Sequence, residues 1–540
     1  MRLSFVIFST ASIIVSLLLS IYHSHAWFIL LAIFTLISVM GYIDMFQTKH
    51  SIKRIYPILG SLRYLMEDLR PKIYQYFVES DIDGRPINRV DRSTIYQRAK
   101  KENDTMPFGT KLDVYSEGYE WVCHSLLPKD FNTLDQNPRI IVGNKDCQQP
   151  YSCSIYNISA MSYGSLSSNA VEAMNAGAKI GGFAHNTGEG GLSPYHLKHN
   201  GDIIWQIGTG YFGCRTEDGN FDAKLFEQKA SYPQVKMIEL KLSQGAKPGH
   251  GGILPAAKNT KEIAEIRHVK PHTLIASPPY HSAFNTPREL IQFIQKLRTL
   301  AEGKPVGFKL CIGHKSEFIG ICKAMIELNT YPDFITVDGA EGGTGAAPQE
   351  FSNYVGAPLL DGLDFVHNIL TGLGIREHIK IFASGKITNG FHIMRAMSLG
   401  ADACYSARAM MMAVGCIQAL VCNTNKCPAG VATQDPKLTV GLVVEDKKTR
   451  VANFHKKTVL SFVELLGASG LDDMKKITRS HIYRRISFQS MLTYDEIFPS
   501  YKYGDFLTKI PERYENDFKH ANPDSWEFNY IGSWSNYCEL

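Results

Sequence analysis

The chain has 540 residues, of which 44% are hydrophobic and 20% are charged, enough to bury the core of one large α/β barrel with additional segments. Its 57 Lys and Arg residues against 52 Asp and Glu residues give a net charge of +5, too small and too dispersed to indicate a nucleic-acid partner. The 11 cysteines do not form the dense, even framework of a secreted disulfide-rich protein, so a reducing compartment fits them better.

Two apolar runs open the chain. Leu3 to Tyr22 is apolar apart from Ser and Thr, and Trp27 to Ile43 carries no charge before Asp44. Each run is long enough to cross a hydrocarbon layer of about 30 Å. A cleaved signal peptide is an alternative for the first run, but no clear small-residue cleavage site precedes the second. A buried hydrophobic hairpin in a soluble protein is the other alternative. We predict a two-helix transmembrane hairpin over residues 1–48.

The charges beside these runs predict an orientation. Arg2 precedes the first run, and Lys49, Lys53 and Arg54 follow the second. Basic residues are enriched on the cytoplasmic side of membrane spans. We therefore expect an anchor in the lipid of a bacterial-type inner membrane, with both flanks and the whole catalytic domain in the cytoplasm.

The next segment, residues 49–137, is mixed in character. Ile58 to Arg70 has helical periodicity up to a break at Pro71, and residues 81–100 are polar and begin with turn residues. We predict a connecting segment packed on the catalytic domain.

Residues 138–440 alternate short β-branched or aromatic runs with helical stretches. This alternation predicts βαβ units and a parallel sheet. About eight strands, with Gly-rich segments just after several of them, favour a closed (β/α)8 barrel of the TIM type over an open doubly wound sheet. We expect residues 441–540 to form a C-terminal extension. The predicted strand runs are Ser154–Ala160, Phe183–His185, Ile203–Ile207, Met237–Leu242, Thr273–Ala276, Val306–Cys311, Phe334–Val337, Ile381–Ala383 and Ala403–Ser406.

Two late segments have the composition of a phosphate-binding pair. They are Ile381–Lys386, which reads Ile-Phe-Ala-Ser-Gly-Lys, and Gly400–Arg408. In barrels the loops after the last two strands present backbone N–H groups to a phosphate. Ser-Gly-Lys is also an ordinary turn, and only its position in the barrel favours binding. Gly208–Gly213 fits G-x-G-x-x-G, but the polar turn that follows it excludes a Rossmann NAD site.

A cysteine triplet is the most specific feature of the composition. Cys416, Cys422 and Cys427 lie close together in the sequence, and Pro428 follows the last of them. Thiolates cluster where a soft metal or redox chemistry uses them. Structural zinc normally takes four ligands and no His lies in the segment, so three thiols favour an iron–sulfur cluster. A Cys-Pro pair also ends ferredoxin-type ligand runs. Three unrelated buried cysteines are the alternative.

An ordered series of segments runs through roughly residues 150–440. The segments are Ile158–Ser167, Asn186–Gly191, Gln244–Gly252, Ser277–Pro279, Gly342–Pro348 and Cys416–Pro436. In this order they resemble the FMN-binding domain of glutamate synthases. The resemblance implies FMN, a three-iron cluster (3Fe-4S) and an oxidoreductase that acts on CH–NH2 groups.

The resemblance also implies roles for single residues. Glu189 and Lys247 match residues beside flavin and substrate, where a carboxylate and an ammonium orient an imine and manage its proton. Arg267 resembles the family's arginine for the substrate carboxylate, although each of the three alone is compatible with a surface ion pair. Lys309 would place positive charge near flavin N1 and O2. The residues expected at FMN are Ala160, Met161, Ser162, Gln206, Lys309, Gly342, Gly343, Ser384, Gly385, Lys386, Ser406, Ala407 and Arg408.

The chain also departs from the family's pattern. Where the family usually has Gly-Glu-Gly-Gly-Gln, this chain has Gly249–Ile253, and the missing amide leaves the identity of the oxo acid open. The chain begins Met-Arg-Leu, so we expect the family's N-terminal amidotransferase domain to be missing, and the long C-terminal β-helix with it. Ammonia would then come from solution or from a partner.

These expectations define one predicted function and two alternatives. The predicted enzyme reduces 2-iminoglutarate, formed from 2-oxoglutarate and ammonia, or a similar imino acid, to an amino acid. Its electrons come from a redox donor protein such as a ferredoxin or an NAD(P)H-oxidising flavoprotein. One alternative is a membrane-linked amino-acid dehydrogenase that works in the oxidative direction. The other is a non-catalytic FMN-barrel scaffold.

Overall fold

The computed structural model describes residues 1–527 and divides the chain into two compact units, Met1–Arg89 and Val90–Leu540. The division falls inside the predicted connecting segment, residues 49–137. The first part of that segment belongs to the unit of the N-terminal helices, and the second part belongs to the unit of the barrel. Residues 528–540 of the predicted C-terminal extension lie outside the described residues.

The first unit begins with two packed helices, α1 (Arg2–Tyr22) and α2 (Trp27–Phe46). Both are long enough and apolar enough to cross a membrane, by length and composition. Small side chains allow two such helices to approach closely. The small residues buried in this pair are Ser9, Ser16, Ser20, Ser38 and Gly41. Insertion into a membrane stays a prediction.

Two further helices, α3 (Ser51–Ile55) and α4 (Leu59–Ile73), and a π-helical turn, η1 (Tyr74–Val78), complete this part of the chain. The predicted break at Pro71 is wrong, because α4 continues through it. Proline removes one N–H donor from a helix. Here the acceptor that loses its donor is the carbonyl of Glu67, an exposed residue that water can reach.

The second unit is built around a closed barrel of eight parallel strands, which confirms the predicted (β/α)8 fold. The strands follow the chain around the barrel, and the last pairs with the first. They are β4 (Tyr156–Ile158), β5 (His185–Asn186), β6 (Ile203–Ile207), β7 (Val235–Lys241), β10 (Val306–Leu310), β11 (Phe334–Asp338), β12 (Lys380–Ser384) and β13 (Ala403–Ser406).

One predicted run lies outside the barrel. Thr273–Ala276 contains β9 (Ile275–Ala276), which pairs antiparallel with β8 (Ile253–Leu254). Both strands belong to the long connection between β7 and β10. A short β-branched run shows that a strand forms but does not show which strand it pairs with, and this explains the error.

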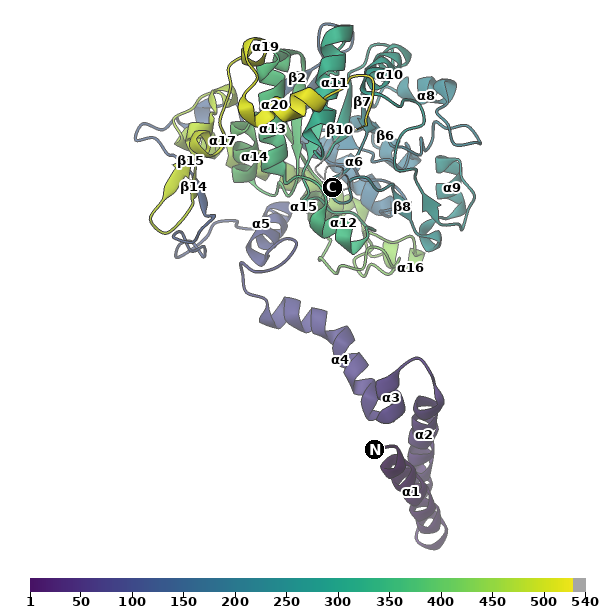
Figure 1. Ribbon diagram of the computed structural model, residues 1–540. Helices are drawn as coiled ribbons and strands as arrows, with labels where there is room; N and C mark the ends of the chain where they lie inside the picture. The colour runs from purple at the N-terminus through teal and green to yellow at the C-terminus, as the bar shows by residue number, and fades with distance from the viewer. Residues whose placement is uncertain (528–540) are drawn as a thin grey trace, which may run out of the picture. The chain divides into compact units, whose positions relative to one another are not determined.

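Helices form the outer layer of the barrel (Figure 1). Helix α10 illustrates their origin: Thr286 caps its first turn by accepting from Glu289 N, and Leu290, Ile294 and Leu297 form its buried face. The helices from α5 to α17 are α5 (Arg89–Lys100), α6 (Ser168–Gly181), α7 (Pro194–Leu197), α8 (Ala223–Ala230), α9 (Lys261–Arg267), α10 (Pro287–Leu300), α11 (Lys315–Leu328), α12 (Gln349–Tyr354), α13 (Leu359–Gly372), α14 (Gly390–Ser398), α15 (Arg408–Val414), α16 (Pro436–Thr439) and α17 (Val444–Ala468).

The C-terminal extension packs on the barrel unit. Helix α17 packs against α6, and α20 (Glu512–His520) packs against α11, where Lys323 Nζ donates to the carbonyls of Phe518 and Ala521, each at 2.8 Å. A small antiparallel sheet joins this extension to the segment before the barrel. The remaining elements are β1 (Glu120–Val122), β2 (Arg139–Val142), β3 (Tyr151–Ser154), β14 (Ile482–Arg485), β15 (Met491–Thr493), α18 (Tyr494–Ile497) and α19 (Asp505–Thr508).

A polar layer fills the barrel interior around Glu239 of β7. Its fully buried carboxylate accepts from Asn186 Nδ2 at 2.7 Å, from Gln206 Nε2 at 2.7 Å and from Thr336 Oγ1 at 2.6 Å. These donors come from β5, β6 and β11. A buried carboxylate requires such partners, so Glu239 fixes the relative positions of four strands.

Candidate functional site

The predicted FMN-binding residues gather at one end of the barrel. Parallel strands direct their carboxyl ends to the same side, and this is where active sites of such barrels lie. Strands β4, β12 and β13 are neighbours, so the segments that follow them meet there. The residues in or just after these three carboxyl ends are Ala160, Met161, Ser162, Ser384, Gly385, Lys386, Ser406, Ala407 and Arg408. Gly342 and Gly343 follow β11, and Lys309 lies near the end of β10.

Gln206 lies deeper in the barrel than the rest of that set. It belongs to β6, is buried, and its Nε2 donates to Glu239. Its observed contact is therefore with the interior polar layer, and a contact with FMN stays a prediction.

An ion pair lies at the centre of the carboxyl end. Lys241 Nζ, from the last residue of β7, is 3.0 Å from Glu189 Oε1, which comes from the loop after β5. Burial raises the pKa of Glu189, but the charges of Lys241, Arg267 and Lys247 outweigh burial and hold that pKa below its ordinary value. Glu189 is therefore ionised at neutral pH.

A second buried ion pair stands on the neighbouring strands. Lys309 Nζ of β10 is 3.1 Å from Asp338 Oδ2 of β11. Burial lowers the pKa of Lys309, but Asp338, Glu239 and Glu189 outweigh it and hold the pKa above its ordinary value. Lys309 thus brings a permanent positive charge to the carboxyl end of the barrel.

Lys247 is buried in the Gly-rich loop after β7. It is 1% exposed, and its Nζ donates to the Ala346 carbonyl at 2.9 Å. Burial lowers its pKa to about 8, while Glu189 opposes that shift and Lys241 adds to it. An ammonium with a pKa this close to neutrality suits proton transfer.

Arg267, the last residue of α9, is enclosed by protein. It is 4% exposed, its Nη2 donates to the Tyr163 carbonyl at 3.0 Å, and its guanidinium lies 5.2 Å from the centre of the Phe212 ring. A Cβ at Gly164 or Gly190 would approach the same guanidinium within 2.9 Å. Its electrostatic partner is Glu189, whose pKa it lowers. A role in holding a substrate carboxylate stays a prediction.

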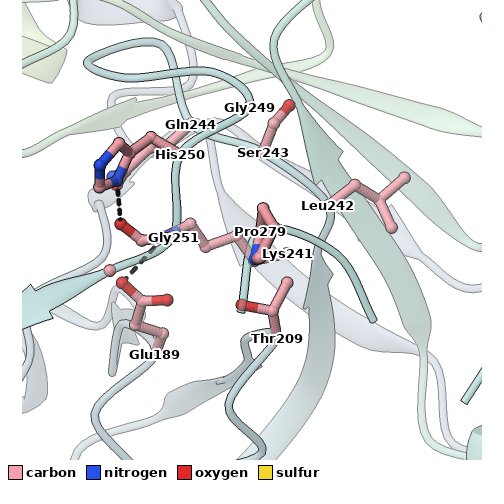
Figure 2. Close-up of a pocket in the computed structure, with 11 residues that line it drawn as sticks. Glu189, Thr209, Lys241, Leu242, Ser243, Gln244, Gly249, His250, Gly251 and Pro279 are labelled. Atoms are coloured by element: carbon pink, nitrogen blue, oxygen red, sulfur yellow. Dashed lines mark hydrogen bonds and ion pairs between the residues drawn. The ribbon is translucent and has the colours of Figure 1, made fainter. Parts of the chain in front are cut away.

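A small hollow lies beside the Glu189–Lys241 pair. Figure 2 shows Glu189, Lys241, Thr209 and His250 around it, with the ion pair drawn as a dashed line. His250 Nδ1 donates a hydrogen bond to the Gly251 carbonyl at 2.8 Å. The lining residues are Glu189, Thr209, Lys241, Leu242, Ser243, Gln244, Gly249, His250, Gly251, Gly252 and Pro279.

Glycine at position 245 is required by backbone packing. A Cβ there would overlap the Gly339 carbonyl oxygen, and Gly245 N donates to Asp338 Oδ2 at 2.8 Å. The Gly-rich loops after β7 and β11 therefore lie backbone against backbone. This close contact explains part of the glycine density that the sequence shows.

The three cysteines of the triplet interact electrostatically. Burial, with smaller contributions from negative charge on Cys422 and Cys427, raises the pKa of Cys416 to about 11. Lys258 is 2% exposed, and burial lowers its pKa to about 8. Cys422 and Cys427 are close enough to oppose that shift electrostatically. Within residues 1–527, no group of three His, Cys, Asp or Glu side chains is arranged to hold a metal ion. Cluster ligation stays a prediction.

Several groups of the site were not predicted from the sequence. Lys241 is the ion-pair partner of Glu189, and Asp338 is the ion-pair partner of Lys309. His250 lines the hollow. The signal for Lys241 was present, because Glu239 and Lys241 are charged residues two positions apart on a strand that is apolar between Lys236 and Glu239, and they must share one face of it. The partner of each charge depends on strand pairing and could not be read from the chain.

A parallel barrel with buried charge pairs at the carboxyl ends of its strands has the architecture of a TIM-barrel enzyme. A model of the conserved region in glutamate synthase matches residues 93–472. The chain therefore belongs to the glutamate synthase family, which comprises oxidoreductases that act on CH–NH2 groups.

Individual relatives differ in how much they share. The glutamate synthase large subunit-like protein YerD of Bacillus subtilis (strain 168) is 38% identical over 493 residues, 84% of this chain and 93% of the relative. An archaeal-type glutamate synthase [NADPH] of Thermotoga neapolitana is 35% identical over 319 residues, 59% of this chain and 60% of the relative. The glutamate synthase [NADPH] large chain of Azospirillum brasilense is 32% identical over 61% of this chain but only 21% of its own length.

Solved structures with detectable similarity include a mutant flavocytochrome b2 with pyruvate bound, at a TM-score of 0.40 and 11% identity over 80% of this chain and 89% of that one. A mandelate oxidase structure aligns at a TM-score of 0.42 and 13% identity over 75% of this chain and 98% of that one. Similarities this distant add nothing to the assignment of the site.

The Glu189–Lys241 pair yields the first testable prediction. Lys241→Met leaves the Glu189 side chain, which is only 18% exposed, without its nearest cation and should lower the free energy of unfolding by about 3 kcal/mol. The double variant Lys241→Met with Glu189→Gln removes both charges and should recover most of that loss. Denaturant unfolding of the two variants and the unchanged protein measures the effect. Equal stability of Lys241→Met and the unchanged protein would contradict the pairing.

Proposed function

We propose that the protein is an FMN- and iron–sulfur-dependent oxidoreductase of the glutamate synthase type. It reduces 2-iminoglutarate, formed from 2-oxoglutarate and ammonia, or a similar imino acid. The observation that carries the proposal is the charge arrangement at the carboxyl end of the barrel: an ionised Glu189 paired with Lys241, and a buried Lys247 whose pKa is about 8. An imine becomes an amine by gaining a hydride and a proton, and these groups serve the proton.

The residues at the carboxyl end of the barrel fit FMN. Lys309 supplies a fixed positive charge, and the glycine-rich loops allow the backbone to approach a flat ring. Within residues 1–527, the buried Nε2 of Gln244 beside the hollow has no hydrogen-bond partner, so a donor is present for a ligand. FMN, when bound, supplies the hydride. The chain's own residues hold the isoalloxazine and phosphate ends and exclude water.

In this proposal Glu189 and Lys247 divide the proton chemistry. Lys247, protonated below pH 8, gives a proton to the nitrogen that becomes the amine. Glu189 holds the nitrogen through its carboxylate and is kept ionised by Lys241. Arg267 also favours the ionised form of Glu189, because its buried charge lowers the pKa of that carboxyl group.

The residues in and near the hollow influence which oxo acid can bind. His250 lines it where the family usually has a glutamate, and Ile253 stands where the family usually has a glutamine. Replacing a carboxylate with an imidazole removes negative charge and favours an anionic substrate group. 2-Oxoglutarate is therefore the first substrate to test, and other oxo acids follow.

The cysteine triplet is supported as a cluster site by its donor set. Three soft thiolates that interact with one another, beside the buried cation of Lys258, suit an anionic iron–sulfur cluster. The cluster, when bound, passes single electrons from a redox donor protein, such as a ferredoxin or an NAD(P)H-oxidising flavoprotein. Helices α1 and α2 would hold the protein at a bacterial-type inner membrane, with the barrel in the cytoplasm.

An anaerobic assay tests the proposed reaction. The purified full-length protein, given 2-oxoglutarate, ammonium and a reduced low-potential donor, should form glutamate, measured by chromatography. Omission of ammonium is the matched control and should abolish the product. No glutamate, together with flavin reduction on addition of glutamate, would contradict the synthase and favour an amino-acid dehydrogenase.

The pKa of Lys247 predicts a pH limit. The pKa lies below the ordinary lysine value, so the ammonium is present below pH 8 and is lost as pH rises through about 8. The value of kcat/KM should fall about tenfold per pH unit above that point. Lys247→Arg, whose guanidinium stays charged, should lower the rate but remove this falling limb. An unchanged limb in Lys247→Arg would assign it to another group.

The cluster assignment predicts a selective loss. Cys422→Ser should remove the iron–sulfur absorbance and electron paramagnetic resonance signal while flavin content remains. Cys147→Ser, at another partly exposed cysteine outside the triplet, is the control and should keep both cofactors. An undiminished cluster signal in Cys422→Ser would end the ligand assignment.

A further inference from the structure

Helix α4 (Leu59–Ile73) carries an apolar stripe that is open to solvent. Successive residues of an α-helix are rotated by about 100°, and six apolar side chains of α4 fall within one third of its circumference. All except Leu69 are exposed, and Leu59 is 63% exposed. The six are Leu59, Leu62, Leu65, Met66, Leu69 and Ile73.

Such a stripe normally faces a protein core. Here the exposed apolar surface continues beyond the helix into η1, where Phe77 is 85% exposed and Val78 is 63% exposed. A contiguous apolar surface of this length marks an interaction site, since water contact with it is unfavourable.

The start of α4 is fixed to the end of α2. Asp44, in the last turn of α2, accepts from Ile58 N at 3.0 Å and from Ser61 Oγ at 3.5 Å through its Oδ2. Gly60 lies against the backbone of α3, where a Cβ would come within 2.7 Å of Lys53 Cα. These contacts hold the first turn of α4 at the level where the second apolar helix ends.

The charges of this region suit an anionic surface. Residues 47–73 contain six basic and two acidic side chains. On α4, Arg70 and Lys72 flank the stripe on its two sides, whereas Asp68 lies nearly opposite Met66. Lys and Arg at the border of an apolar face extend their charges to phosphate groups while their stems remain in the apolar layer.

We propose that α4 lies in the interface of an anionic phospholipid membrane, with its apolar stripe among the acyl chains and its flanking basic residues at the headgroups. The inference rests on the membrane anchor of the proposed function, and it assigns a second, peripheral contact beside the hairpin. Basic side chains near an anionic surface strengthen such binding.

Two cysteine variants test the placement. Met66→Cys lies on the stripe and Asp68→Cys lies on the opposite face, and both positions are exposed in the structure. The full-length protein is placed in vesicles of phosphatidylcholine and phosphatidylglycerol and treated with a water-soluble maleimide. Mass spectrometry of peptides reads each site separately from the native cysteines. The thiol introduced at position 66 should react at least about tenfold more slowly than the thiol at position 68. Equal rates would overturn the proposal.

Two further arms identify what covers the stripe. A phosphatidylglycerol with a photoreactive group in its acyl chain should cross-link to residues 59–73 of the unchanged protein. Cross-links from this helix to the barrel or to a second copy, without lipid adducts, would overturn the assignment. In vesicles of phosphatidylcholine alone, the tenfold difference should shrink at least about threefold. A difference of the same size there would overturn the anionic partner.

Alkaline carbonate extraction separates this proposal from the membrane anchor. A chain that stays with the vesicles has an inserted hairpin, and equal thiol rates in that sample would overturn only the placement of α4. A chain released by carbonate would contradict both the anchor and the placement of α4. Glutamate formation by detergent-solubilised protein is independent of either result.

Discussion

The structure depends on a carboxylate sealed inside the barrel. Glu239 accepts hydrogen bonds from Asn186, Gln206 and Thr336, and these neutral donors fix four strands in one register. Side chains on one face of a strand recur every second residue, so the register also places Lys241 one layer nearer the carboxyl end. There it meets Glu189. The interior hydrogen bonds and the charge pairs at the carboxyl end of the barrel are thus consequences of one strand alignment.

The charged groups at the carboxyl end of the barrel determine one another's protonation states. Glu189 stays ionised because three cations outweigh its burial, and Lys309 stays protonated because three carboxylates do so. Lys247 differs, because burial prevails and its pKa falls to about 8. A site with two fixed charges and one group poised near neutrality is suited to moving a proton, and this is what the reduction of an imine requires.

The sequence predicted what depends on local periodicity and left open what depends on pairing. The alternation of strand runs and helices was sufficient for the (β/α)8 barrel. The run Thr273–Ala276 was misplaced because its pairing with β8 depends on the fold.

The predicted helix break at Pro71 was wrong because a proline late in an exposed helix costs one hydrogen bond that water replaces. The sequence shows Gly-rich segments after several strands, but the need for glycine at position 245 depends on the fold, because the Gly339 carbonyl occupies the space of its Cβ. The predicted catalytic residues do meet around Glu189, yet the burial of Arg267 could not be foreseen from its position in the chain.

The most direct test of the central claim is a single turnover without an external donor. The purified protein is reduced by light under anaerobic conditions and mixed rapidly with 2-oxoglutarate and ammonium while flavin absorbance is followed. The account predicts that the flavin reoxidises and that one glutamate forms for each flavin reoxidised. A flavin that stays reduced, or that reoxidises without forming an amino acid, would contradict it.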